Sequence, residues 1–547
     1  MFRLNRVLSG WLVAAALTAC TDTLNVQNEN NPDRLRVLSR ASDVEALVSG
    51  SFATIFNGTF GVDGVGPSAR TMSWENASNL ANWGLGPRSA IPRPFLDNTR
   101  GNPYQGENSY DFNPLSRAER SSADGINRLT LGGVTLGDAK QNARAKAFGW
   151  FCLGVAEGYL ALTFDSSTTV DPYADLAVIP DLSGYNEVNA AALAHLDSAI
   201  AWTTTANAAA TTGVNGFPLP NTWINGYAPT AVQFIQLISS FKAYFRANVA
   251  RTPADRAAVD WTKVKSAADS GITTDISVTV GGSSGFTIAE NQWWLYQQWG
   301  QLNQMIGGMA DSTGTYDAWL ASPNKVQFLI RTLDKRFPSG DTRTAQIAAS
   351  PAVPVGTYPY MKPYFRNRAT ADPDAAPWSS YYDWYRMLAW YQAASTGPFP
   401  WFTKPQNDLL RAEARIRLSD IAGAAPLIDL TRTVNGLPAL AGVVTTATQA
   451  VPGGSACVPH IPQPPTYLTT ACGNIMEAMK WEYRLETMYT SYISQYYSGR
   501  GWGDLPNGTP FQWPVPYTEM DTRRHPSYNM GGVGNPGGAV GVGNYGY

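Results

Sequence analysis

The sequence predicts a mainly α-helical protein with long irregular insertions and a minor β component. Three observations support this fold class. Several segments repeat apolar residues every three or four positions, long stretches rich in Gly, Pro, Asn and Trp separate them, and only one short strand pair stands out. We predict a signal peptide over residues 1–19, one large domain over residues 20–530 and a Gly-rich tail over residues 531–547.

The first helix is predicted over residues 43–57. Val44, Val48 and Phe52 share one face of it, and Ser42 or Asp43 is suited to cap its N-terminus. The same apolar period predicts helices over residues 142–164, 230–249, 261–270, 405–418, 421–434 and 474–497. Long loops are predicted over residues 58–138, 205–229, 339–377 and 436–470. Loops of this length are usually functional or heavily packed.

A short strand pair is predicted over residues 276–280 and 286–289. The turn between them, residues 281–285, matches the G-x-S-x-G pattern. A nucleophile elbow also needs a following helix and a His with an acid, so we interpret this turn as a flexible hairpin. Residues 532–537 spell G-x-G-x-x-G, but no strand precedes them and Pro536 interrupts them, so they belong to a low-complexity tail.

Composition excludes several classes of function. The net charge is -2, only 15% of residues are charged, and no stripe of Lys and Arg is present, so nucleic acid is not an expected partner. The three His residues, His195, His460 and His525, lie far apart. We therefore predict no catalytic residues, no metal site and no cofactor.

The N-terminus is typical of an exported protein. Arg3 and Arg6 precede an apolar run that is too short to span a bilayer, and small residues follow it. Residues 17–20 (LTAC) resemble the bacterial lipobox, which predicts a lipid attached to Cys20. An ordinary secretory signal with an incidental Cys is the alternative. Several acyl chains are sufficient for stable membrane attachment.

Export places the remaining cysteines in an oxidising compartment. We predict that Cys457 and Cys472 form a disulfide around a Pro-rich loop. Cys152 lies in an apolar run, where a buried inert thiol is expected.

Two C-terminal blocks, read together with the lipobox, resemble the SusD/RagB family of outer-membrane nutrient-binding lipoproteins. The first block runs from residues 409–414 (LLRAEA) through residues 428–432 (IDLTR) to residues 436–438 (GLP). The second runs from residues 475–476 (IM) through residues 480–486 (KWEYRLE) and 499–505 (GRGWGDL) to Glu519. Residues 31–33 (NPD) before the first helix also fit. The resemblance spans the mature chain, although the middle third matches only in outline.

This resemblance implies a scaffold of tetratricopeptide-like helix pairs whose irregular insertions form a ligand surface on one side. Family members capture oligosaccharides, or peptides in the RagB branch, and deliver them to a TonB-dependent outer-membrane transporter. They are not enzymes. The chain departs from the pattern at Lys480 and Trp481, where many relatives carry Glu-Arg, and in its Gly-rich tail.

Sugar rings offer apolar faces and hydroxyl groups, so binding favours exposed aromatic rings beside amides. Three clusters have this composition. They contain Trp74, Asn76 and Trp83; Trp293, Trp294, Tyr296 and Trp299; and Tyr381, Tyr382 and Trp384. We predict these residues as ligand contacts. For the first two clusters, packing onto the scaffold is the alternative, and for the third the alternative is an interface with the transporter.

We therefore expect a lipid-anchored, cell-surface-facing outer-membrane subunit for nutrient uptake that binds carbohydrate. Its expected partners are a TonB-dependent transporter and an oligosaccharide. A peptide-binding RagB-like carrier, a surface structural or adhesion lipoprotein, and a secreted glycoside hydrolase are the alternatives. The hydrolase requires two carboxylates about 5–9.5 Å apart in a cleft, and the sequence nominates no such pair.

Overall fold

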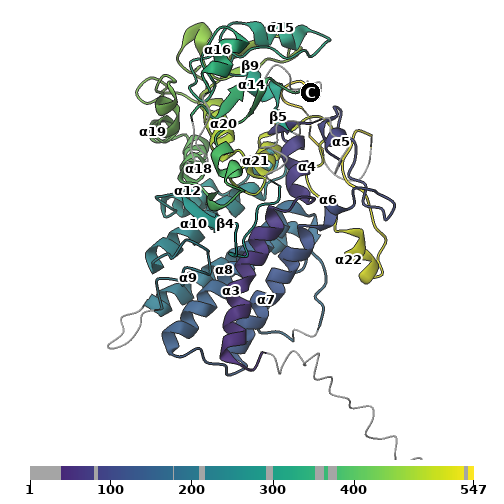
Figure 1. Ribbon diagram of the computed structural model, residues 1–547, viewed down its shortest axis with the longest axis vertical. Helices are drawn as coiled ribbons and strands as arrows, with labels where there is room; N and C mark the ends of the chain where they lie inside the picture. The colour runs from purple at the N-terminus through teal and green to yellow at the C-terminus, as the bar shows by residue number, and fades with distance from the viewer. Residues whose placement is uncertain are drawn as a thin grey trace, which may run out of the picture.

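The computed structural model describes residues 38–78, 84–175, 178–207, 216–290, 300–350, 362–367, 378–534, 540–541 and 543–547. Four long helices fill the lower half of Figure 1: α3 (Ala41–Thr59), α7 (Phe112–Thr130), α8 (Ala139–Thr163) and α9 (Tyr185–Asn207). The helix α8 packs against the other three, and every residue from Ala147 to Thr163 is buried. No helix in the described ranges is long and apolar enough to cross a bilayer.

The helix α10 (Ala231–Asn248) connects this group to the rest of the scaffold, since it packs against α8 and α9 and also against α12 (Trp261–Asp269) and α18 (Lys404–Arg417). Glycine permits the close approach to α8, because a Cβ on Gly158 would lie 2.2 Å from the ring of Phe245. The helices α19 (Ile421–Arg432) and α20 (Ile475–Thr487) pack on α18 and enclose a second apolar core. The expected helical scaffold is confirmed.

Shorter helices occupy the insertions of the described chain. They are α4 (Val65–Met72), α5 (Leu85–Ser89), α6 (Gly106–Ser109), α11 (Pro253–Ala257), α14 (Gln304–Gly308), α15 (Thr315–Ala321), α16 (Arg343–Ala348), α17 (Leu388–Gln392), α21 (Ser494–Trp502), α22 (Tyr517–Thr522), η2 (Thr433–Asn435) and η3 (Gly454–Ala456). Strands form antiparallel pairs: β1 (Asn76–Ala77) with β5 (Gln301–Leu302), β2 (Ser166–Ser167) with β3 (Ser183–Gly184), β4 (Ile276–Val280) with β8 (Gly397–Phe402), β6 (Phe365–Asn367) with β7 (Tyr382–Trp384), and β9 (His460–Pro462) with β10 (Thr470–Cys472).

The predicted pairing of residues 276–280 with residues 286–289 is wrong. The strand β4 pairs with β8, which comes from more than a hundred residues later in the chain. Strand β8 supplies Phe399 and Trp401, both fully or almost fully buried, so it offers β4 a large apolar partner. Only the turn persists, since the amide of Gly281 donates to the carbonyl of Phe286 over 2.9 Å.

The helix predicted over residues 474–497 is interrupted. It ends at Thr487 as α20, and α21 begins at Ser494. Between them, Tyr489 and Ile493 have left-handed backbone angles, φ +57° and +38°. The amide of Tyr489 donates to Glu75 over 2.7 Å instead of to a helical carbonyl. This buried tertiary bond replaces the helical one.

The described residues of the Gly-rich tail are packed against the chain rather than separate from it. Gly541 exchanges backbone hydrogen bonds with Gly508 and Thr509, and Tyr545 is 3% exposed. In Figure 1 the C-terminus lies beside β5 and α5. A glycine is required at Gly541, because a Cβ there would lie 2.4 Å from a backbone oxygen.

Cys457 and Cys472 form a disulfide in the structure, with their Cα atoms 5.8 Å apart, and Cys152 is a buried thiol. Mass spectrometry of the denatured, non-reduced protein without Cys20 is expected to find one free thiol. Three free thiols would contradict the pairing. Because 15 residues separate the two cysteines, the chain-entropy model gives the bond about 3 kcal/mol of stability.

Candidate functional site

The structure brings together segments that are far apart in the sequence. In the β1–β5 pair, Ala77 lies opposite Gln301, and β5 follows residues 291–299 closely in the chain. The segment at residues 378–384 lies along β5, since Ser380 donates its amide to the carbonyl of Leu302 over 3.2 Å. The segments that carry Asn76 of the first cluster and Tyr381 of the third therefore both lie beside β5.

Burial decides against an exposed ligand platform at Trp74 and Asn76. The Trp74 indole is 2% exposed and donates its N–H to the carbonyl of Asp504 over 3.1 Å. The Asn76 amide donates to the Tyr489 hydroxyl over 3.2 Å and accepts from Thr71. Both side chains fix the insertion to the scaffold, which corresponds to the packing alternative.

The third cluster is also mostly internal. Tyr382 is fully buried and its hydroxyl bonds Gln346, while the ring of Trp384 packs edge-on against that of Phe365. Tyr381 is partly exposed, with the Arg343 guanidinium 4.2 Å from its ring centroid. The remaining candidates, Cys20, Trp83, Trp293, Trp294, Tyr296 and Trp299, lie outside the described residues.

A pocket that the sequence did not single out lies between the α3–α4 loop and α6. This cavity of about 380 Å³, the tyrosine pocket, is lined by Asp63, Pro103, Tyr104, Gln105, Gly106, Glu107 and Tyr110. Its volume lies within the range of small-molecule sites. Tyr110 is 53% exposed and Tyr104 is partly exposed, so both rings are open to a ligand.

The two carboxylates of the tyrosine pocket have different environments. Both oxygens of Glu107 are occupied: Arg88 donates to Oε1 over 2.6 Å and to Oε2 over 3.0 Å, and the Ser68 hydroxyl also donates to Oε2. Asp63 Oδ1 is buried and has no hydrogen-bond partner within the described chain. Burial raises the pKa of the Asp63 carboxyl. Asp63 therefore contributes to the pocket wall a carboxylate whose Oδ1 makes no hydrogen bond within the described chain.

This arrangement suits recognition of a hydroxyl-bearing ring. Tyr104 and Tyr110 supply flat aromatic faces, Asp63 accepts a hydrogen bond, and Gln105 supplies both donors and an acceptor. Covalent hydrolysis of a glycoside needs a second available carboxylate. The engagement of Glu107 by Arg88 and Ser68 leaves that role unfilled.

The signal for this pocket was present in the sequence. Residues 103–110 (PYQGENSY) place two tyrosines beside amide side chains within a stretch predicted as a long loop. The other three clusters were predicted from the same composition. They were preferred because they contain tryptophan, which residues 103–110 lack.

One group of side chains has metal-ligand composition in the described chain. The ligand atoms of Cys457, His460 and Cys472 lie within 4.8 Å of one another. Both sulfur atoms are joined in the disulfide, so only the His460 imidazole is available to a metal.

No family model and no curated protein matches this sequence. Solved structures do match its fold. A SusD superfamily protein from Bacteroides thetaiotaomicron has a TM-score of 0.52 at 12% identity, over 88% of this chain and 96% of that one. A SusD-like protein from Bacteroides fragilis has a TM-score of 0.52 at 12% identity, over 92% and 98%. A SusD/RagB family protein from Bacteroides thetaiotaomicron has a TM-score of 0.50 at 12% identity, over 88% and 94%.

Proposed function

We propose that this protein, whose fold is SusD-like, captures oligosaccharides at the cell surface and passes them uncleaved to a TonB-dependent outer-membrane transporter. The tyrosine pocket carries the proposal. It combines two exposed aromatic faces with an unused buried acceptor on Asp63, in an insertion of a helical scaffold. Stacking and hydrogen bonding are sufficient for capture, and no covalent step is required.

Two alternatives make different use of the same residues. A peptide carrier would place an ammonium group near Asp63 and an apolar side chain on the tyrosines. A hydrolase would use Asp63, whose pKa is raised by burial, as the acid and Glu107 as the second carboxylate. We favour a carrier over a hydrolase because Glu107 is already neutralised by Arg88 at 2.6 Å.

Tyr110→Ala is expected to weaken oligosaccharide binding several-fold to tenfold, because a ring contact of this kind contributes roughly 1 kcal/mol beyond the area it buries. Isothermal titration with maltoheptaose, cellohexaose, xylohexaose, mannohexaose and chitohexaose measures the loss. Tyr173→Ala is the matched control, since Tyr173 is 47% exposed and lies outside the pocket. Equal affinities for wild type and Tyr110→Ala would show that the oligosaccharide does not bind in the tyrosine pocket.

The lipid anchor at Cys20 remains a proposal that rests on the lipobox at residues 17–20. Cys20→Ser is expected to move the protein from the membrane fraction to the soluble fraction, because the acyl chains that hold it are then missing. Fractionation with and without detergent measures this. A variant that stays with the membrane until detergent is added would place the anchor elsewhere.

A further inference from the structure

We propose that the C-terminal tail builds a second pyranose-binding pocket, distinct from the tyrosine pocket. This inference rests on the proposed function, since it assumes an oligosaccharide ligand. The cavity has a volume of about 410 Å³. The tail residues Gly543, Gly546 and Tyr547 line it together with Tyr467, Asn507 and the Ile91–Pro92 pair. We call this cavity the tail pocket.

Buried hydrogen bonds hold the tail in place beside the pocket. The Tyr545 hydroxyl accepts from Arg484 over 3.0 Å and lies 3.0 Å from a carboxylate oxygen of Asp504. The amide of Asn507 donates to the carbonyl of Tyr547 over 2.8 Å. The wall formed by the tail is therefore preformed, which reduces the conformational entropy lost on binding.

Two tyrosine rings are positioned by their neighbours. The partly exposed Tyr547 packs edge-on against Trp378, with ring centroids 4.8 Å apart, and the Lys325 ammonium lies 5.3 Å from its ring centroid. Tyr467 is also partly exposed and has φ +56°, a left-handed backbone that bulky residues adopt rarely and that often marks functional sites.

Gly546 is what lets the tail meet Tyr467. A Cβ at position 546 would lie 2.5 Å from the Tyr467 Cβ, so no other residue allows this approach without a shift. The Gly-rich composition, which the sequence alone assigned to a low-complexity tail, therefore has a structural reason at this position. Gly546 lets the tail backbone contact Tyr467 at the wall of the tail pocket.

The lining of the tail pocket selects for a neutral, hydroxyl-bearing ring. No acidic side chain lines it among the described residues, whereas Asp63 and Glu107 line the tyrosine pocket. The polar groups that it offers are tyrosine hydroxyls, the Asn507 amide and glycine backbone. Aromatic faces with uncharged donors and acceptors match the apolar face and the hydroxyl groups of a neutral pyranose.

Tyr467→Gly tests the proposal, because it removes the aromatic ring while glycine adopts the left-handed backbone of this position freely. Saturation-transfer difference NMR and titration use the oligosaccharide of the panel that binds wild type best. We expect wild type to show two binding sites. Tyr467→Gly and Tyr547→Ala are each expected to weaken binding at the tail pocket several-fold to tenfold. Tyr110→Ala is expected to weaken binding at the tyrosine pocket instead.

A wild-type isotherm for both Tyr467→Gly and Tyr547→Ala, with Tyr110→Ala still impaired, would overturn the tail pocket and leave the proposed function standing. Absence of binding to every oligosaccharide in the panel would overturn both. Circular dichroism confirms that each variant is folded. If Tyr547→Ala fails to fold, Tyr467→Gly and Asn507→Ala decide the question.

Discussion

Trp74→Ala is expected to lower the free energy of unfolding by about 3–5 kcal/mol, the usual cost of truncating a buried tryptophan. The indole is 2% exposed, donates a hydrogen bond to the Asp504 carbonyl, and packs edge-on against Trp378 with ring centroids 5.7 Å apart. Truncation removes these contacts together and leaves a cavity. Urea denaturation followed by circular dichroism measures the change in the midpoint at constant slope.

Trp202→Ala is the control, because this indole on α9 is partly exposed and the Lys146 ammonium lies 4.4 Å from its ring centroid. We expect Trp202→Ala to lower the free energy of unfolding clearly less than Trp74→Ala does. If Trp74→Ala unfolds at the wild-type urea concentration yet loses oligosaccharide affinity, the indole is a ligand platform, and its assignment to the core is contradicted.

Arg336→Met is also expected to lower the free energy of unfolding by about 3–5 kcal/mol, because it removes the cation that three buried carboxylates share. The Arg336 side chain is fully buried and pairs with Asp334 at 2.7 Å, Glu482 at 2.8 Å and Glu486 at 3.2 Å. These bonds tie α20 to the insertion before α16. Adding Asp334→Asn to Arg336→Met is expected to recover part of the loss, since the buried carboxylate whose ion pair is with Arg336 alone is then neutralised. Thermal denaturation of both variants measures this.

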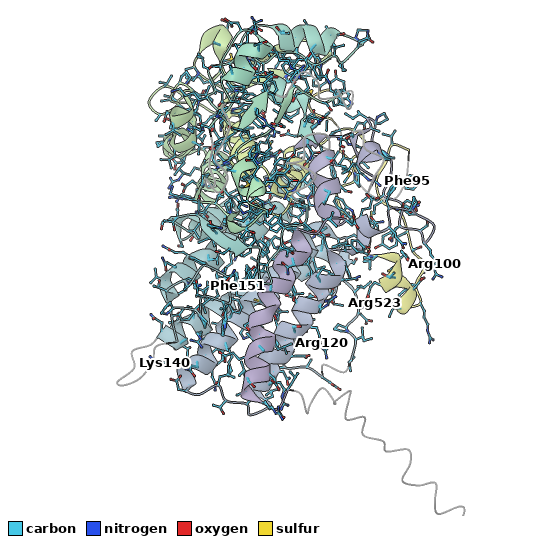
Figure 2. The ribbon with its side chains drawn as sticks, in the orientation of Figure 1. Phe95, Arg100, Arg120, Lys140, Phe151 and Arg523 are labelled. Atoms are coloured by element: carbon cyan, nitrogen blue, oxygen red, sulfur yellow. A yellow bond between two sulfur atoms is a disulfide. The ribbon has the colours of Figure 1, made fainter. Side chains whose placement is uncertain are left out.

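Arg100→Met is the matched control for a surface ion pair. Arg100 pairs with Asp521 at 2.6 Å, but their side chains are 79% and 49% exposed. Figure 2 shows Arg100 on the flank of the molecule, near α22. Its loss is expected to cost no more than about 1 kcal/mol. Equal losses of unfolding free energy for Arg100→Met and Arg336→Met would contradict the claim that burial makes the Arg336 ion pairs more important for stability.

The sequence predicted helices where one face is apolar. All seven segments with a clear apolar period are helical, although the last is split. The helix α7 was missed because its buried face includes Glu119, Ser122 and Asp124, which weakens the apolar period. The pairing of β4 with β8 was missed because no local pattern indicates a partner so distant in the chain.

The candidate site was harder to predict, because exposure depends on tertiary contacts. Trp74 and Asn76 have the composition of a binding loop, but Asn76 bonds Tyr489, which lies 413 positions later. Conversely, Tyr110 remains exposed, although the aromatic and amide composition around it is of the same kind as that around the buried Trp74. Composition identified the right kind of residue, and only the fold decided which of them face solvent.

The most direct test of the central claim, capture of an oligosaccharide without cleavage, joins titration to product analysis. The mature protein is titrated with the oligosaccharide panel, and the ligand is then recovered and analysed by mass spectrometry. We predict binding of at least one oligosaccharide, its recovery intact, and weaker binding by Tyr110→Ala. Shortened products with new reducing ends would contradict the claim in favour of a hydrolase. Tight binding of peptides with no oligosaccharide binding would contradict it in favour of a peptide carrier.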